Sequence, residues 1–125
     1  MNMQGRMTTL TIKRGDVISC KYKVFKNDPK ASHHPFVVVS TRNNKVKILV
    51  CTDKRHANKF SNCVNINYRK CRLKKPTCVI CSKYTFISES DITSRIGRLS
   101  NRDYRRVVTA LCNDKNIPQY FEHWR

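Results

Sequence analysis

Apolar residues come in short clusters from Thr11 to Ile87, and most of these clusters have the spacing of β-strands. Residues 35–40, with the sequence PFVVVS, form a nearly continuous β-branched run that is typical of a central strand. Residues 45–51, KVKILVC, begin with apolar–polar alternation and end fully apolar. The residues between them, Arg42–Lys45, favour a turn, so we predict that the two runs form a β-hairpin.

Three further segments favour strands. Residues 17–24 follow a Gly–Asp pair and alternate over their second half, residues 63–68 alternate throughout, and residues 78–81 form a short apolar run. Residues 27–30 and 74–76 separate these segments and carry the Asn, Asp, Pro and Lys residues of turns and loops.

The pattern becomes helical near the C-terminal end. Residues 100–103, SNRD, have the form of a capping box with Asp in the place of Glu. Apolar residues then recur at the spacing of one helix face, which predicts an amphipathic helix to about Asn113. They are Tyr104, Val107, Val108 and Leu111. We expect residues 117–125 to pack back onto the domain or onto a partner. The chain is therefore predicted to be one domain, 1–125, mainly β with five to seven short strands and a C-terminal helix.

The balance of charge indicates which kind of partner this fold binds. The chain has 26 Lys and Arg residues against 8 Asp and Glu residues, a formal net charge of +18. Such an excess favours a polyanion as partner, and nucleic acid, RNA above all, fits better than a merely solvated surface. No run approaches the ~20 apolar residues of a membrane span. Residues 1–6 have no apolar run of the kind that opens a signal peptide, so we expect no membrane partner and a cytoplasmic location.

The seven cysteines allow two readings. An odd count in a reducing compartment argues against a disulfide framework. Cys63, Cys71, Cys78 and Cys81 could be grouped as a zinc site. However, Cys78 and Cys81 lie in a segment predicted to be a strand, where residues three apart point to opposite faces. We therefore expect reduced thiols in or near the core, and no metal site.

Four segments, in this order, resemble the PemK/MazF toxins. They are the GDVI of residues 15–18 with the HPFVVVS of 34–40, the strand 47–52, the KPTCVICSK of 75–83, and the ITSRIGRLS of 92–100. The resemblance covers about residues 13–111. It implies a small SH3-like barrel of the PemK/MazF/CcdB type that forms a homodimer and cuts single-stranded RNA without a cofactor. It also implies an antitoxin partner, which in this family is usually an acidic protein segment.

The reaction of the family sets requirements that the residues can be tested against. The ribose 2′-hydroxyl attacks the adjacent phosphate and leaves a cyclic phosphate and a 5′-hydroxyl, so the protein must supply a base, an acid and a group that stabilises the extra negative charge. His34 stands where the family has the Arg of its Arg–Pro pair, and histidine is suited to proton transfer near neutral pH. His33 is the alternative. Thr52 matches the family's functional hydroxyl position, and Lys83 could stabilise charge.

Other basic and polar residues are candidates for RNA contacts. They are Arg42, Lys54, Arg55, His56, Lys59, Lys74, Lys75 and Ser82. Ser82 is the main departure from the family, because some members have an acidic residue there that acts as the base, and a serine cannot replace it. Each of these basic and polar residues has a simpler interpretation as a solvated side chain. For Thr52, the simpler interpretation is the end of a strand.

Two other functions remain open at this point. The first is a barrel that binds RNA or DNA and does not cut it, which the departures at His34 and Ser82 favour. The second is a ToxN-like ribonuclease that is inhibited by an antitoxin RNA, which the charge of +18 makes physically reasonable. The leading prediction is a metal-independent endoribonuclease toxin.

Overall fold

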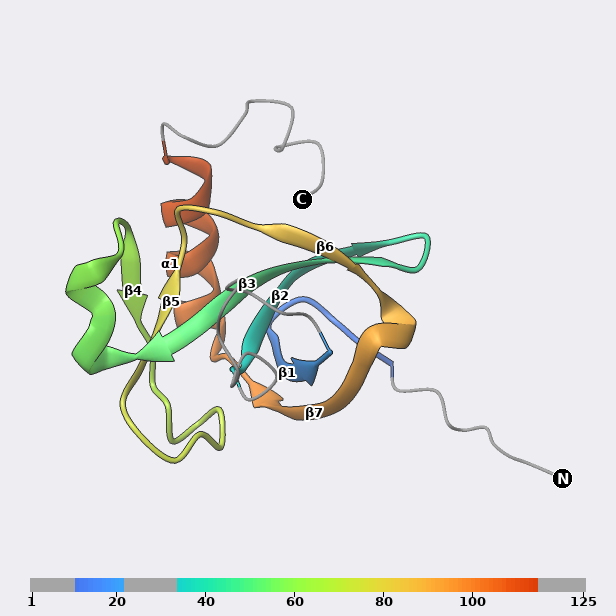
Figure 1. Ribbon diagram of the computed structural model, residues 1–125, viewed down its shortest axis with the longest axis horizontal. Coiled ribbons are helices and arrows are strands. Elements are labelled where there is room, and N and C mark those ends of the chain that lie inside the picture. Colours follow the sequence, from blue (N-terminus) through green and yellow to red (C-terminus); the bar gives the residue numbers. More distant parts are fainter. Residues whose placement is uncertain (1–10, 22–33, 115–125) are drawn as a thin grey trace, which may run out of the picture.

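The computed structural model describes residues 11–21 and 34–114 (Figure 1). The elements in these ranges are β1 (Asp16–Cys20), β2 (Phe36–Arg42), β3 (Lys45–Asp53), the 3-10 helix η3 (Lys54–Lys59), β4 (Cys63–Asn65), β5 (Thr77–Ile80), β6 (Thr85–Ser88), the 3-10 helix η4 (Glu89–Asp91), β7 (Ile92–Arg98) and α1 (Asn101–Cys112). The predicted class, mainly β with a C-terminal helix, is confirmed.

Strand β3 organises the sheet because it pairs with three neighbours. It lies antiparallel to β2, its first half pairs with β6, and its last residues pair with β5. The strand order is β4-β5-β3-β2-β1-β7, with β6 beside β3. In Figure 1, β6, η4 and β7 curve around the outside of β1 and β2. No pairing joins β4 to β7 in the described ranges, so the sheet curls into a small barrel-like form without closing.

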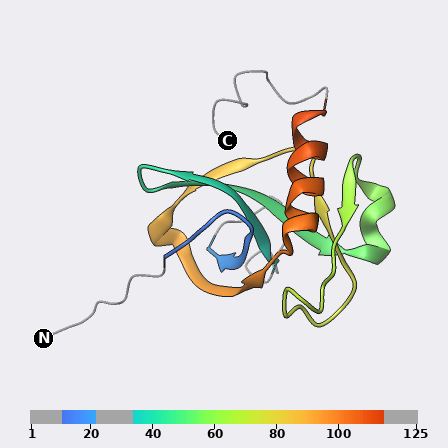
Figure 2. The same cartoon turned by 180° about the vertical axis from the view of Figure 1, so that it is seen from behind.

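The central strands are apolar on both faces, and each face has its own core. Val37 and Val39 of β2 join a cluster that α1 covers through Val107 and Leu111. Phe36 and Val38, which alternate with them, join a second cluster inside the curl of the sheet. Figure 2 shows α1 lying across one face of the sheet. Because both of its faces are buried, β2 has a nearly continuous apolar sequence.

The predicted hairpin between β2 and β3 is confirmed. Its two-residue turn consists of Asn43 and Asn44, which both have positive φ values of 49° and 69°. Asparagine tolerates this left-handed region better than most residues, and a two-residue turn of this kind matches the twist of the strands that it joins. The turn fixes the register in which Arg42 pairs with Lys45.

Only half of the predicted capping box forms at the start of α1. The Ser100 hydroxyl accepts a hydrogen bond from the Asp103 amide at 3.1 Å, as expected. The Asp103 carboxylate instead accepts hydrogen bonds from the Asn67 amide at 2.7 Å and from the Arg106 guanidinium at 3.1 Å. The buried Asp103 therefore ties the helix to the loop before β5 and does not close its own cap. The helix otherwise ends close to the predicted residue.

Two predicted strands are shorter than expected, and two strands were not predicted individually. The strand expected over 17–24 ends at Cys20, and Lys21 lies in a bend. The strand expected over 63–68 ends at Asn65, because the Asn67 amide binds Asp103 and the chain then enters a turn. Strands β6 and β7 are short or mostly exposed, and the buried–exposed alternation that would reveal them is weak. Residues 22–24, the turn predicted over 27–30 and the tail 117–125 lie outside the described residues.

The Gly–Asp pair at the start of β1 has a structural role. Gly15 has a φ of +86°, which only glycine adopts easily. Asp16 is fully buried and accepts hydrogen bonds from the Lys13 amide at 2.8 Å and from the Arg98 guanidinium at 3.0 Å. This pair therefore holds the first turn against β7.

Candidate active site

A cavity of about 660 Å³ opens at the carboxyl-terminal end of β3. Six parts of the chain form it: the residues before β2, the end of β3, the start of η3, the loop between β4 and β5, the first residue of β5, and one residue of β7. The described residues that line it are His34, Pro35, Cys51, Thr52, Asp53, Arg55, His56, Arg72, Leu73, Lys74, Lys75, Thr77 and Ile96.

Backbone hydrogen bonds around β3 bring these segments together. The Cys51 amide donates to the Pro35 carbonyl at 2.9 Å, which places His34 and Pro35 beside the end of β3. On the other side, Thr52 pairs with Cys78 of β5. The sheet register alone therefore places the two segments that carry His34 and Thr52 at one cavity.

His34 and Thr52 both contribute to the wall, with different exposure. His34 is half-buried, in the coil just before β2. Thr52 is the penultimate residue of β3 and is only 8% exposed, so pairing within the sheet fixes its backbone. A threonine hydroxyl can both donate and accept a hydrogen bond, which suits a contact with a phosphate oxygen or with a neighbouring acid.

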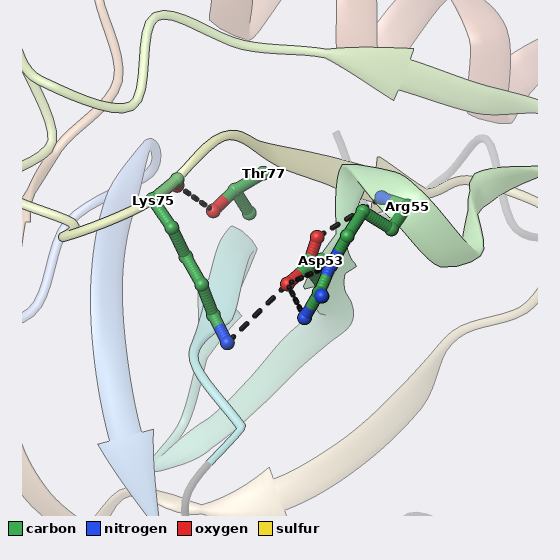
Figure 3. A network of polar contacts seen from close by, with 4 residues as sticks. All are labelled: Asp53, Arg55, Lys75 and Thr77. Atoms are coloured by element: carbon green, nitrogen blue, oxygen red, sulfur yellow. Dashed lines mark hydrogen bonds and ion pairs between the residues drawn. The ribbon is translucent and has the colours of Figure 1, made fainter.

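The Asp53 carboxylate binds two cationic side chains at the edge of the cavity (Figure 3). Its carboxylate accepts hydrogen bonds from the Arg55 amide at 2.9 Å and from the Arg55 guanidinium at 3.0 and 3.2 Å. The ammonium group of Lys75 lies 3.3 Å from the same carboxylate. These bonds, above all those from Arg55, hold the pKa of Asp53 well below its usual value. Asp53 is therefore a weak base, and its charge partly neutralises Arg55 and Lys75.

Six of the residues predicted from the sequence lie together around the cavity. They are His34, Thr52, Arg55, His56, Lys74 and Lys75. Lys54 lies beside them, in a smaller hollow of about 380 Å³ that it shares with Asp53, Arg55, Lys75 and Pro76. Lys59 is exposed at the end of η3. His33 lies outside the described residues.

Three predicted residues lie away from this cavity. Arg42 pairs with Lys45 at the hairpin turn, seven residues along β3 from Thr52, or roughly 23 Å of extended strand. Ser82 and Lys83 follow the far end of β5, whereas Thr77, at its near end, lines the cavity. The structure therefore does not bring these three residues to His34 and Thr52.

Arg72 was not predicted from the sequence, although it lines the cavity. It lies in the loop between β4 and β5, together with Leu73, and faces the same space as Ile96 of β7. The spacing of apolar residues does not single it out, because the alternation of residues 63–68 indicates only a strand. The one available signal was the density of basic residues from Arg69 to Lys75.

The cysteines behave as buried thiols. Five of the seven are buried, which confirms their predicted place in the core. Burial is the main cause that raises the pKa of Cys81 to about 12 and that of Cys71 and Cys78 to about 11. Cys51 touches the cavity, and burial raises its pKa well above the ordinary value as well. None of these four is therefore an activated nucleophile.

No three His, Cys, Asp or Glu side chains in residues 11–21 and 34–114 are placed to hold a metal ion together. No helix in that part of the chain is both long and apolar enough to cross a membrane.

The fold is shared with known structures. An endoribonuclease in complex with its cognate antitoxin, from a mycobacterial species, matches with a TM-score of 0.64 at 15% identity, over 86% of this chain and 97% of that one. A mycobacterial endoribonuclease gives a TM-score of 0.64 at 15% identity, over 90% and 98%. The Mycobacterium tuberculosis toxin MazF-mt6 gives 0.59 at 16% identity, over 78% and 93%. At these identities the likeness shows the fold.

Sequence comparison identifies the family. A search of curated proteins finds no match. The model of the PemK-like, MazF-like toxins of type II toxin–antitoxin systems matches residues 13–113, which is most of the chain and includes the whole of the candidate site. The match agrees with the resemblance inferred from the order of motifs. The chain belongs to the PemK-like, MazF-like toxin family.

Proposed function

We propose that this chain is the toxin of a type II toxin–antitoxin pair and acts as a metal-independent endoribonuclease on single-stranded RNA. The observation that carries the proposal is that His34 and Thr52 line one cavity with several cations. The two structural neighbours described as endoribonucleases have the same fold. Membership of the toxin family supports the same activity.

Several residues of the cavity have separate roles in the reaction. In this reaction RNA supplies its own nucleophile, the ribose 2′-hydroxyl, so the protein needs no activated serine or cysteine. His34 takes the proton from the 2′-hydroxyl or gives a proton to the leaving 5′-oxygen, and solvent water serves as proton acceptor or donor for the other transfer. Thr52 hydrogen-bonds a non-bridging oxygen of the scissile phosphate. Lys74 provides positive charge next to these two residues, and His56 provides ring nitrogens that can form hydrogen bonds.

Lys83 and Ser82 have no part in this proposal. They follow the end of β5 that lies away from the cavity. A cation there would need to reach along the whole strand to touch a phosphate held by Thr52. Arg42 is excluded for the same reason, since the hairpin carries it to the other end of β3.

The partner that fits this surface best is an acidic protein. The net charge of +18 favours a polyanionic inhibitor, and in a type II system the antitoxin is a protein. An inhibitor RNA, as in ToxN-like enzymes, is the weaker alternative because the matching family is the type II one. We further propose that the toxin is a homodimer that acts in the cytoplasm, where its RNA substrate and its antitoxin are both present.

The test is to incubate the protein with a mixed single-stranded RNA in EDTA and to map the ends of the products. Cleavage that leaves 5′-hydroxyl and cyclic phosphate ends would support the proposal. Salt-sensitive RNA binding without cleavage would favour the non-catalytic barrel instead. Cleavage that EDTA abolishes would show that a metal ion takes part and would contradict the metal-independent reaction.

A further inference from the structure

The reaction needs a group that stabilises the extra negative charge on the phosphate, and His34 stands where the family has an arginine. We infer that Arg72, from the loop between β4 and β5, supplies that stabilisation by hydrogen-bonding the non-bridging oxygens of the scissile phosphate. The inference rests on the proposed function, because it assigns a further catalytic residue to the same reaction. Arg72 lines the cavity that His34 and Thr52 line.

The guanidinium of Arg72 is available for a ligand. In residues 11–21 and 34–114, its side chain makes no hydrogen bond or ion pair, and the residue is exposed. The other arginine of the cavity, Arg55, is bound to Asp53 through two of its nitrogens. Lys75 is held by the same carboxylate. With respect to the described residues, Arg72 is therefore the arginine of this cavity whose charge no carboxylate offsets.

The backbone of Arg72 is also held in an unusual conformation. Four non-glycine residues of the described ranges have a positive φ, and three of them are asparagines, which tolerate it. Arg72 is the fourth, with a φ of 63°. A long side chain in the left-handed region is uncommon, and strain of this kind gathers at functional sites where the surrounding structure imposes it.

The surrounding structure imposes this backbone conformation on Arg72. The turn is closed by three backbone bonds: Cys71 and Leu73 both donate to the Tyr68 carbonyl, at 3.1 and 2.9 Å, and Arg72 donates to the Arg69 carbonyl at 3.1 Å. Cys71 is 1% exposed and belongs to the core cluster beneath α1. The loop is thus a rigid support, and a rigid support is what a transition-state contact requires.

Two neighbours fix the position of this support. A Cβ on Gly97 of β7 would lie 2.6 Å from the Cys71 carbonyl carbon, so only glycine lets the strand and the loop approach this closely. On the other side, the Asn67 amide donates to the buried carboxylate of Asp103 at 2.7 Å. Gly97 and Asp103 are therefore positioning residues for Arg72. The close contact at Gly97 also brings Ile96, its neighbour, into the wall of the cavity.

The neighbouring arginine provides a matched control. Arg69 is exposed, lies in the same turn and carries the same charge. Its guanidinium stacks on the Tyr68 ring, 5.6 Å from the centroid, and its Nε donates to the Tyr68 hydroxyl at 3.3 Å. Arg69 does not line the cavity. Loss of Arg69 should lower the general attraction for RNA and leave the chemical step unchanged.

The experiment compares single-turnover cleavage of a short single-stranded RNA in EDTA by wild type, Arg72→Gly, Arg72→Lys and Arg69→Gly. Glycine suits the positive φ of residue 72, so Arg72→Gly removes the cation without straining the turn. We expect its maximal rate to fall about 10²–10³-fold, the usual effect of removing one charge-stabilising donor, with little change in the RNA concentration at half-maximal rate. Millimolar guanidinium ion should restore part of the rate to Arg72→Gly and none to Arg69→Gly.

Three results would overturn the inference. Cleavage by Arg72→Gly at the wild-type rate would show that Arg72 takes no part in the reaction, and it would leave the proposed function intact. A change in the half-saturating RNA concentration alone would show that Arg72 only attracts RNA. If wild type does not cleave at all, the proposed function and this inference both fail. Circular dichroism of each variant shows whether it is folded.

Discussion

Gly97 and Cys71 approach each other so closely that a Cβ on Gly97 would lie 2.6 Å from the Cys71 carbonyl carbon and 3.1 Å from its Cα. Real Cβ atoms essentially never lie within 3.0 Å of another heavy atom, and here the obstacle is backbone, which cannot rotate away. The contact joins β7 to the turn that carries Arg72. One glycine therefore links the sheet to the wall of the candidate active site.

Gly97→Ala should lower the free energy of unfolding by about 1–3 kcal/mol, the usual cost of forcing extra volume into a packed contact. The cleavage rate should fall as well, because the turn and Arg72 must move. Urea denaturation measures the first effect. Arg95→Ala, an exposed residue of the same strand, is the control and should change the stability little. Equal stability of Gly97→Ala and wild type would contradict the close contact.

Asp103 should stabilise the protein through its bond to the Asn67 amide. Asp103→Ala leaves that amide without its acceptor and should cost about 1–3 kcal/mol. Asp103→Asn retains a carbonyl oxygen as acceptor and should cost less. The exchange rate of the Asn67 amide with solvent should rise in the alanine variant and much less in the asparagine variant. If the two variants lose equal stability, the carboxylate does not act through this bond.

Asp53 should make stability depend on pH in the acid range. Its folded-state pKa is lowered by Arg55 and Lys75, below the ~3.9 of an unfolded chain. A lowered pKa contributes stability above about pH 4, and this contribution is lost as the pH falls further. Melting temperatures between pH 5 and pH 2 should therefore decrease more steeply for wild type than for Asp53→Asn. Parallel curves would show that Asp53 is not stabilised by its cations.

Asp53 should also limit the affinity for RNA, because it offsets the charge of Arg55 and Lys75. Asp53→Asn should bind a 2′-O-methyl RNA, which lacks the attacking hydroxyl, more tightly and with a steeper dependence on salt. Glu89→Gln, in η4, changes the net charge equally and is the control. An equal gain in affinity in both variants would mean that the effect is only long-range charge.

The parts of the fold that were predicted correctly are those with strong local signals. The hairpin followed from its Asn–Asn turn, and β2 and β3 followed from their apolar runs. The helix followed from its spacing and from the Ser100 cap. Strands β6 and β7 carry weak alternation because their side chains are largely exposed, and their place is set by pairing with β3 and β1.

The candidate site was predictable where a family motif, a strand end or a basic loop marks its residues, and not where only contacts between distant segments do. Thr52 and Arg55 could be placed because they lie close to the end of the long apolar strand β3. Arg72 could not, because its position depends on Gly97 and Asp103, which are far from it in the sequence. Lys83 matched a motif position, yet the direction of β5 carries it away from the cavity. A linear motif does not encode such a direction.

The central claim is that the cavity around His34 and Thr52 cuts RNA. The most direct test is the maximal single-turnover rate of RNA cleavage in EDTA by His34→Ala. The control is Lys45→Ala, at an exposed position at the other end of β3. We predict that His34→Ala loses about 10²–10⁴-fold, the usual contribution of a proton-transfer group, while Lys45→Ala cleaves at nearly the wild-type rate. Cleavage by folded His34→Ala at the wild-type rate would contradict the account.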